Sequence, residues 1–551
     1  MRRLGCVVLG WVVAIGSTLA MGMHHAGAAT PQTPADAARG VNETLAGELT
    51  PVSTPAKSQP AARADDETFI RRATLDLVGR APTPAEVTAF VLDPAEDKRP
   101  RLIKRLLGDE AFGRNWARYW RDVIMYRASD PRAAIASAPL ERYLADQFNR
   151  GTSWKDITKS FITATGDVRE NGQTALIMAQ QGQAEEVTAE VSRVFMGVQI
   201  QCAQCHDHPT DRWKRAQFHE MAAFFPRVRV RPVRGDGNQR SFEVVSVDRQ
   251  TRFRGGQQGQ RGTIEHYMSD LDKPSERGTL MTPKFFATGR TLDTGTADKN
   301  RRETLADWLT SSRNPWFTRA FVNRLWAEMV GEGFYEPIDD LGPDRACSAP
   351  KTLDLLAEQF TVNQYDIKWL FETIAATDAY QRASRKRRDI EGTPFVANCN
   401  QRLRGDQLYT VITQVLGIAD SFAGRTGRPM GPYGGGGLRA VFNQTFGYDP
   451  STPREEVAGS IPQALFMMNS PLLQGGIDGR RPGSLLGQLL RDIDDDQTLV
   501  SELYLRCLSR APKPSEMQTC LEHLGKTPDR REAFEDLLWA LVNTTEFLHR
   551  K

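Results

Sequence analysis

The chain has 551 residues, 40% of them hydrophobic, which is enough for roughly two to four domains with apolar cores. Its 71 lysines and arginines against 68 aspartates and glutamates leave a formal charge of +3. These figures exclude a wholly disordered protein, and they exclude an overall positive field that would attract nucleic acid or anionic lipid.

The first 28 residues have the features of an export signal. Arg2 and Arg3 precede an apolar stretch from Leu4 to Met23, and Ala26-Gly27-Ala28 follows with the small residues of a cleavage site. The alternative is an uncleaved membrane anchor, because the stretch approaches the roughly 20 residues that cross a bilayer. We expect an exported protein, in the periplasm or at the cell surface, with no membrane span after signal cleavage.

Helical patterns follow a polar stretch. Residues 29–66 are rich in Ala, Pro, Thr and Ser without apolar periodicity, which predicts a disordered linker. Thr83-Pro84-Ala85-Glu86 then has the N-cap, first-turn proline and third-position glutamate of a capping box, before apolar residues at helical spacing. We expect a mainly α fold, a helical two-domain protein whose first domain covers residues 67–226.

One short segment in this domain carries distinctive chemistry: Cys202-Ala203-Gln204-Cys205-His206-Asp207-His208-Pro209. Its spacing allows two thiols to bind the vinyl groups of a haem while the next imidazole ligates the iron. Cys202 and Cys205 are therefore predicted to bind haem c, with His206 as the proximal ligand. The second axial ligand is open among Met221, Met268, Met281 and His266.

His208 leaves two alternatives open. With it, the two cysteines and two histidines form a Cys2His2 set for zinc or iron. The other alternative is a disulfide between Cys202 and Cys205, with histidines that cap a turn. Because Pro209 ends a polar turn, we expect a partly open pocket with His206 pointing inward.

The rest of the chain divides into three predicted parts. Residues 227–290 are predicted to form a small β-rich insertion, because the segment from Phe242 to Val247 is rich in β-branched residues. A second helical domain is expected over residues 291–480, including a helix that Asn314 caps. Within it, the adjacent Asp339 and Asp340 suit a cap or turn better than acid–base catalysis.

The end of the chain repeats its first helical segment. The sequence from Gly79 to Glu86 returns from Ser509 to Glu516, and the match continues downstream to Phe112 and Phe547. Residues 481–551 are therefore predicted to form a C-terminal helical hairpin that repeats the 67–112 motif. Lys513 lacks the capping side chain of Thr83, so we expect a looser second copy.

Two regions resemble known families. The segment from Val191 through the cysteine motif to Phe225 resembles the planctomycete cytochrome-c-like domain of unknown function. Three later segments resemble the planctomycete-specific domain of unknown function that usually follows it: Leu305–Leu309, Asn323–Trp326 and Asp339–Gly342. The resemblance implies a CxxCHxHP motif in the first domain and defines no activity. Residues 344–350 replace the more usual proline-rich, histidine-bearing linker.

The sequence thus predicts an exported envelope protein with a haem c or other metal site, which passes electrons to or from a redox partner. The first alternative is a surface or scaffold protein with a structural metal or disulfide site, which the terminal repeat favours. The second is a metal-dependent enzyme on an extracellular polymer, for which Trp213 offers a stacking face. No residue is assigned a catalytic role, and no nucleic-acid partner is expected.

Overall fold

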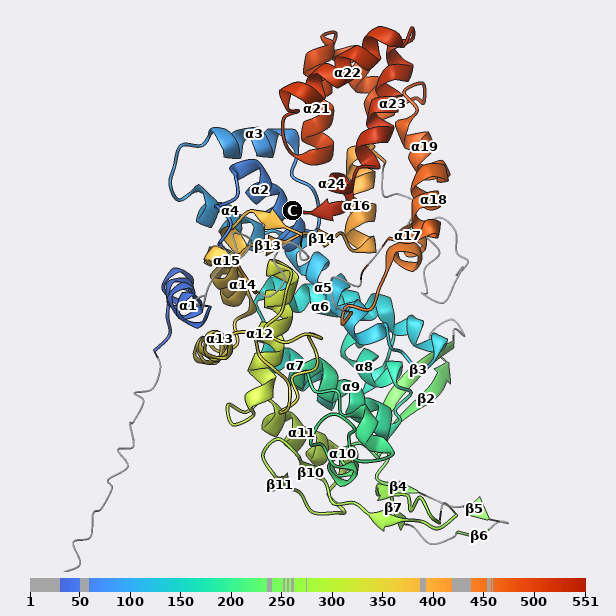
Figure 1. Cartoon of the computed structure of the whole chain (residues 1–551). Coiled ribbons are helices and arrows are strands. Elements are labelled where there is room, and N and C mark those ends of the chain that lie inside the picture. Colours follow the sequence, from blue (N-terminus) through green and yellow to red (C-terminus); the bar gives the residue numbers. More distant parts are fainter. Residues whose placement is uncertain are drawn as a thin grey trace, which may run out of the picture.

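The computed structural model describes residues 30–49, 59–234, 240–250, 253–254, 257–258, 262–273, 275–386, 393–418, 438–452, 457 and 459–551. The export signal predicted for residues 1–28 lies outside this part of the chain. Helices dominate the described residues, and the sheets have only two or three strands (Figure 1). The predicted mainly α fold with small β elements is confirmed.

The segment predicted as a disordered linker contains a helix. Helix α1 spans Pro34–Glu48 and begins at Thr33, whose side chain accepts a hydrogen bond from the backbone of Asp36. Its buried face packs against α13 (Pro350–Val362) and α14 (Ile367–Ala376), where Glu48 accepts two backbone N–H groups at the start of α13. The linker prediction was wrong over α1, because Val41 and Leu45 with two alanines form a narrow apolar stripe in a polar segment.

The helices of the first half surround a large apolar core. They are α2 (Asp66–Val78), α3 (Pro84–Leu92), α4 (Lys98–Leu107), α5 (Glu110–Met125), α6 (Ser137–Arg150), α7 (Trp154–Thr163), α8 (Ala175–Ala179), α9 (Ala184–Met196) and α10 (Arg215–Ala222), with 3-10 turns η2 (Pro131–Ala136), η3 (Gly172–Thr174) and η4 (Gln201–Gln204). The capping box that starts α3 is formed as predicted.

The predicted β-rich insertion follows α10. Strands β2 (Val228–Arg234) and β3 (Arg240–Ser246) form a hairpin in which Val230 pairs with Val244, and β1 (Gly166–Asp167) joins the outer edge of β3. Short two-residue strands complete the insertion: β4 (Arg249–Gln250), β5 (Phe253–Arg254), β6 (Gln257–Gln258), β7 (Gly262–Thr263), β8 (Tyr267–Met268), β9 (Thr279–Leu280), β10 (Lys284–Phe285) and β11 (Arg290–Thr291).

The second half contributes to two cores. Helices α11 (Asp298–Leu309), α12 (Pro315–Val330), α13, α14 and α15 (Asp378–Gln381) complete the first core, in which α12 packs on α9. From Leu403 onward the buried residues form a second core. Its elements are α16 (Gly405–Val415), α17 (Leu438–Phe446), α18 (Ile461–Asn469), α19 (Pro471–Ile477), α20 (Leu485–Asp492), α21 (Asp496–Leu508), α22 (Pro514–Lys526), α23 (Arg530–Val542) and α24 (Thr545–Leu548). Four short strands lie between the two cores: β12 (Ser384–Arg385), β13 (Asn398–Cys399), β14 (Gln401–Arg402) and β15 (His549–Arg550).

The terminal repeat has the same structure in both copies. In each copy a helix ends in a left-handed residue, Gly79 after α2 and Ser509 after α21, and two further helices follow. Arg80 binds both carboxylate oxygens of Glu86, and Arg510 binds those of Glu516, with matching distances of 2.7 and 2.8 Å. The second copy lies beside the first at the upper end of the view in Figure 1.

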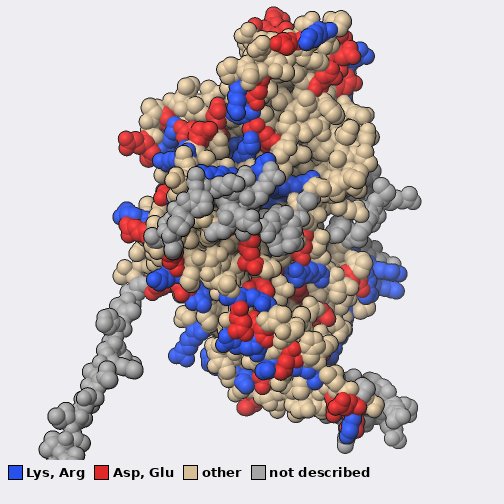
Figure 2. Space-filling view, viewed as in Figure 1, with Lys and Arg blue, Asp and Glu red and all other residues tan. Residues whose placement is uncertain are grey.

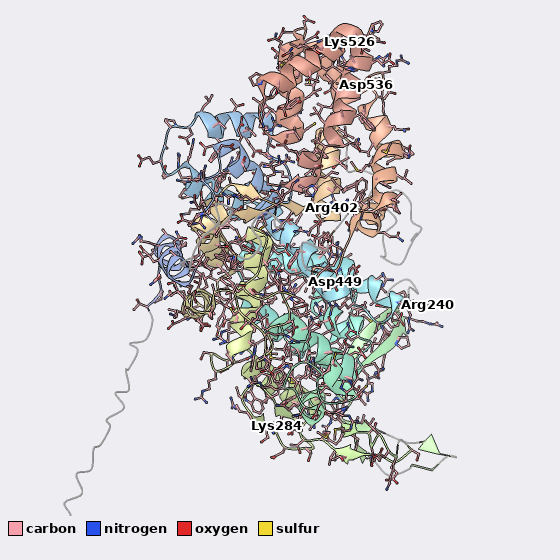
Figure 3. All side chains as sticks on the ribbon, in the orientation of Figure 1. Arg240, Lys284, Arg402, Asp449, Lys526 and Asp536 are labelled. Carbon is pink, nitrogen blue, oxygen red and sulfur yellow. The ribbon has the colours of Figure 1, made fainter. Side chains whose placement is uncertain are left out.

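The surface carries both signs of charge. Figure 2 shows lysines and arginines interspersed with aspartates and glutamates over the visible face, in keeping with the small net charge. Figure 3 places Arg402 and Asp449 at the junction of the two cores, and Arg240 near the tip of the β2–β3 hairpin. Among the described residues, no helix combines the length and the hydropathy that a membrane crossing needs.

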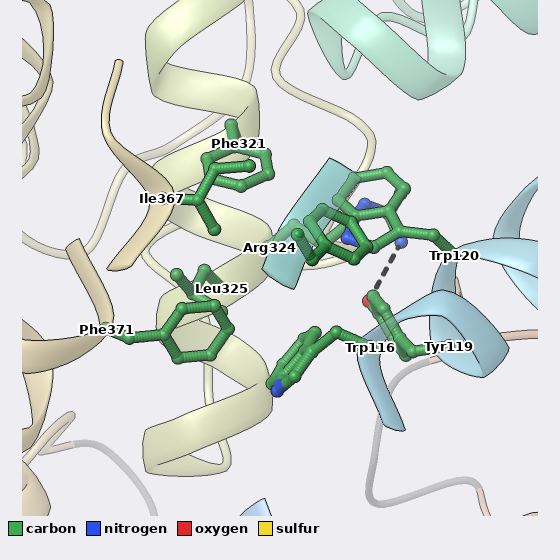
Figure 4. Close-up of a pocket in the computed structure, with 9 residues that line it drawn as sticks. Trp116, Tyr119, Trp120, Phe321, Arg324, Leu325, Ile367 and Phe371 are labelled. Atoms are coloured by element: carbon green, nitrogen blue, oxygen red, sulfur yellow. Dashed lines mark hydrogen bonds between the residues drawn. The ribbon is translucent and has the colours of Figure 1, made fainter. Parts of the chain in front are cut away.

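The interior of the first core is aromatic. Figure 4 shows Trp116, Tyr119 and Trp120 of α5 facing Phe321 and Arg324 of α12 around a narrow cavity. Arg324 donates a hydrogen bond to the Tyr119 hydroxyl at 3.4 Å. Tilted, stacked and edge-on ring pairs with centroids 4.4–5.7 Å apart fill the space, so this cavity is a packing gap of the core and not a ligand site.

Candidate functional site

The cysteine motif lies on a short turn at the surface of the first core. The 3-10 turn η4 carries Cys202, and Cys205 follows directly after it. Both thiols are free and exposed, whereas Ala203 between them is fully buried and its backbone N–H donates to the carbonyl of Ile200 at 2.9 Å. The buried methyl group thus anchors the turn while both sulfurs remain accessible from outside.

His206 presents one free ring nitrogen. Its Nδ1 lies 2.6 Å from the carbonyl oxygen of Asp207, and because a carbonyl only accepts, Nδ1 must carry the proton. In the neutral ring the lone pair is then on Nε2, the arrangement that a metal-binding histidine needs. The ring is exposed, so the prediction that His206 points inward to a pocket was wrong.

His208 has the opposite arrangement. The backbone N–H of Thr210 donates to His208 Nδ1 at 3.3 Å, so the neutral ring carries its proton on Nε2. Its own backbone N–H donates to the carbonyl of Trp213 at 2.8 Å. His208 therefore stabilises the turn between His208 and Trp213. Over the described part of the chain, no group of three or more His, Cys, Asp or Glu side chains is placed to hold a metal ion.

Asp207 attaches the motif to α10. Its carboxylate accepts hydrogen bonds from the backbone of Arg215, the first residue of the helix, at 3.0 Å and from Lys214 Nζ at 2.9 Å. The Arg215 N–H and then the Lys214 ammonium lower the pKa of Asp207. A charged Asp207 at this position also interacts favourably with the positive end of the helix.

A pair of buried histidines lies behind the turn. The carbonyl of Gln204, between the cysteines, accepts from His219 Nε2 at 3.0 Å and from Arg215 Nε at 3.3 Å. His219 Nδ1 lies 2.9 Å from His266 Nε2, and His266 Nδ1 lies 3.9 Å from Glu185. Burial lowers the pKa of His219 and lowers that of His266 to about 4. Sequence spacing did not identify His219, because its hydrogen-bond partners, Gln204 and His266, come from two other segments of the chain.

The four candidates for a second axial ligand have other surroundings. Met221 and Met281 are buried, Met268 is half-buried in β8, and His266 is engaged by His219. Trp213 is likewise buried, in edge-on contact with Trp316 and Phe286, so the stacking face expected for a substrate is used inside the protein.

The adjacent carboxylates of the second half each form ion pairs with arginines. Asp339 is fully buried and pairs with Arg193 at 3.1 Å and Arg324 at 3.5 Å. Burial alone would raise the pKa of Asp339, but the two guanidinium groups bring it below its usual value. Asp340 pairs instead with the partly exposed Arg345.

Comparison with known proteins finds two family models, in the predicted order. PSCyt2, described as a protein of unknown function (DUF1549), matches residues 52–230, which include the cysteine motif. PSD1, described as a protein of unknown function (DUF1553), matches residues 301–434, which include α12 and Asp339. No curated protein and no solved structure matches the chain. The chain thus has the two-part architecture of unknown function that its motifs predicted.

Proposed function

We propose that this chain is an exported protein that binds haem c through Cys202 and Cys205, with His206 as the proximal ligand, and transfers electrons. The observation that carries the proposal is the state of His206: its Nδ1 proton is held by the Asp207 carbonyl, and its Nε2 is free beside two exposed thiols. The charged and apolar pattern of residues 1–28 supports export, which covalent haem attachment requires.

The residues present fit the group. Two accessible thiols provide the thioether bonds, and an imidazole with a free Nε2 provides the iron ligand. When bound, haem supplies one-electron redox chemistry. The chain's own part is to fix the ligands: the Asp207 carbonyl sets the tautomer of His206, and the Asp207 carboxylate attaches the motif to α10.

The structure favours haem over a Cys2His2 zinc or iron site. In that alternative His208 must also offer a free nitrogen to the metal. Its Nδ1 already accepts from Thr210, and its Nε2 carries the proton in the neutral ring. A metal at His208 would therefore require this turn to open or the ring to lose the Nε2 proton.

The test is expression in a host with a periplasmic haem-c maturation system. We expect an alkaline-pyridine haem band and a mass increase of one haem, both lost when Cys202 and Cys205 are replaced by Ser. His206→Ala and His208→Ala form a matched pair: the first should lose the native haem spectrum, and the second should keep it. A wild-type protein with neither the band nor the mass increase would end the haem proposal.

A structural role in the envelope is the second candidate, and the duplicated helical unit favours it. In its metal form, zinc or iron should co-purify in equimolar amount, and His206→Ala and His208→Ala should reduce it equally. In both forms, metal or disulfide, replacing Cys202 and Cys205 should lower the melting temperature. Unchanged stability of that double variant would contradict a structural role for the cysteines.

A further inference from the structure

One backbone carbonyl of the cysteine turn accepts hydrogen bonds from two side chains inside the protein. Gln204, the residue between Ala203 and Cys205, turns its carbonyl inward, where His219 Nε2 and Arg215 Nε lie at 3.0 and 3.3 Å. Both donors come from α10, so the turn and this helix are joined behind the exposed thiols. The His219 ring is 5% exposed, and its hydrogen bond to the half-buried Gln204 is therefore partly shielded from water.

The second histidine determines which nitrogen of the first carries the proton. The Gln204 carbonyl only accepts, so His219 must be protonated on Nε2, and its Nδ1 then accepts from His266 Nε2. Only one neutral arrangement satisfies both contacts. His266 is itself buried in a nearly parallel stack with His219 and has Glu185 of α9 behind it. Arg215 and Glu185 are the charged groups that act on His219.

We propose that His219 is a positioning residue of the cysteine site, oriented by His266, and that it holds the turn so that Cys202, Cys205 and His206 stay in a fixed relation. The effect of His219 on the haem ligands rests on the proposed haem function. The hydrogen bonds of His219 to Gln204 and His266 are present without haem. No protein residue other than His219 and Arg215 is found to bond the Gln204 carbonyl within the described chain.

Three variants separate positioning from packing. His219→Phe keeps a buried ring and removes the donor, whereas His219→Gln replaces it with an amide that donates from a similar position. His208→Ala, at a half-buried ring of the same loop, is the control. The haem-free protein is compared by amide hydrogen exchange, with the buried Ala203 amide as the reporter of the turn and a peptide of α12 as the reporter of global stability.

We expect the Ala203 amide in His219→Phe to exchange roughly ten-fold faster, the effect of losing one hydrogen bond of ordinary strength, with no change in α12. His219→Gln and the control should exchange as the wild type does. In haem-loaded protein, the reduction potential should shift in His219→Phe and return in His219→Gln. Equal exchange at Ala203 in His219→Phe and the wild type would overturn the proposal, whether or not haem binds.

A measurement on the unaltered protein covers the case in which His219→Phe does not fold. Nitrogen-detected imidazole spectra at neutral pH should show His219 and His266 both protonated on Nε2. A His219 ring protonated on Nδ1 would overturn the inference. If the wild type takes up no haem but the exchange and the tautomers are as expected, the haem proposal fails and the positioning role of His219 stands.

Discussion

His206 and His208 are two residues apart, yet hydrogen bonds to the backbone give them opposite tautomers. The sequence alone left both as metal ligands, because the spacing of side chains says nothing about which nitrogen a neighbouring carbonyl or N–H engages. The structure separates them only because Asp207 and Thr210 present different backbone groups. The cysteines were identified from spacing, and His266 was named only as a possible second axial ligand. His219, behind the turn, was not identified.

The pair of buried histidines predicts a pH dependence of stability. Burial depresses the pKa of His266 to about 4 from a usual value of 6.5. As the pH falls below 6.5, the unfolded chain takes up a proton that the folded chain does not, so the free energy of unfolding decreases until about pH 4. A shift of this size corresponds to about 3 kcal/mol.

His266→Gln removes this titration, and urea unfolding at several pH values measures it. The variant should lose less stability than the wild type between pH 7 and pH 4.5. A slope in His266→Gln equal to that of the wild type would mean that the pKa of His266 is the same in the folded and the unfolded chain, and would contradict this prediction.

Asp339 and Asp340 form a matched pair for a test of buried charge. Asp339→Asn leaves the buried Arg193 and Arg324 without their shared carboxylate, which should cost about 3–5 kcal/mol. Asp340→Asn breaks one partly exposed pair with Arg345 and should cost about 1 kcal/mol or less. Denaturant unfolding of both variants measures the difference. Equal losses would contradict the role of Asp339 as the centre of a buried ion network.

Among the elements, the helices with local start residues were the most predictable. Thr83, Pro84 and Glu86 determine the start of α3 through contacts within four residues, and the structure has them. Helix α1 was missed because its stability comes from packing against α13 and α14, some 300 residues away in sequence. The order of the two halves was predictable from motifs, but the division of the apolar residues into two cores was not. That division depends on contacts between helices far apart in the sequence, such as α9 with α12 within the first core.

The two repeat copies predict unequal contributions from their N-caps. The Thr83 hydroxyl accepts from the Glu86 N–H at 3.2 Å, whereas Lys513 offers Glu516 only its backbone N–H. Thr83→Ala should therefore cost about 1 kcal/mol, and Lys513→Ala should cost much less. Lys513→Thr should instead stabilise the protein by about 1 kcal/mol, because it completes the box in the second copy. Thermal unfolding measures all three, and a destabilised Lys513→Thr would refute the equivalence of the two caps.

At the scale of the whole molecule, α2 connects the two cores. Phe69 and Leu77 lie in the first core and Leu75 in the second. Arg71 of the same helix donates to the carbonyls of Cys507 and Phe547 in the second repeat copy, and burial lowers its pKa to about 10. An ion pair between Arg127 and Asp449, at 2.8 Å, also crosses the junction, where Figure 3 labels Asp449. We therefore expect the two cores to unfold together and not as separate domains.

The pair between Asp76 and Arg550 tests this coupling. Asp76 lies at the end of α2 and is 7% exposed, and Arg550 of β15 binds it at 2.5 Å beside the Tyr380 hydroxyl at 2.9 Å. Arg550→Met leaves a buried carboxylate without its cation, which should cost about 3–5 kcal/mol. The double variant Asp76→Asn with Arg550→Met should recover part of that loss, because no unpaired charge remains.

If the cores are one cooperative unit, Arg550→Met shifts the unfolding midpoint of both equally. Hydrogen exchange is measured along a urea titration, with the amides of α12 reporting unfolding of the first core and those of α23 unfolding of the second. The two sets of amides should show one coincident transition in the wild type, and again in the variant. A transition of α23 at lower urea than that of α12 would mean that α2 does not couple the cores.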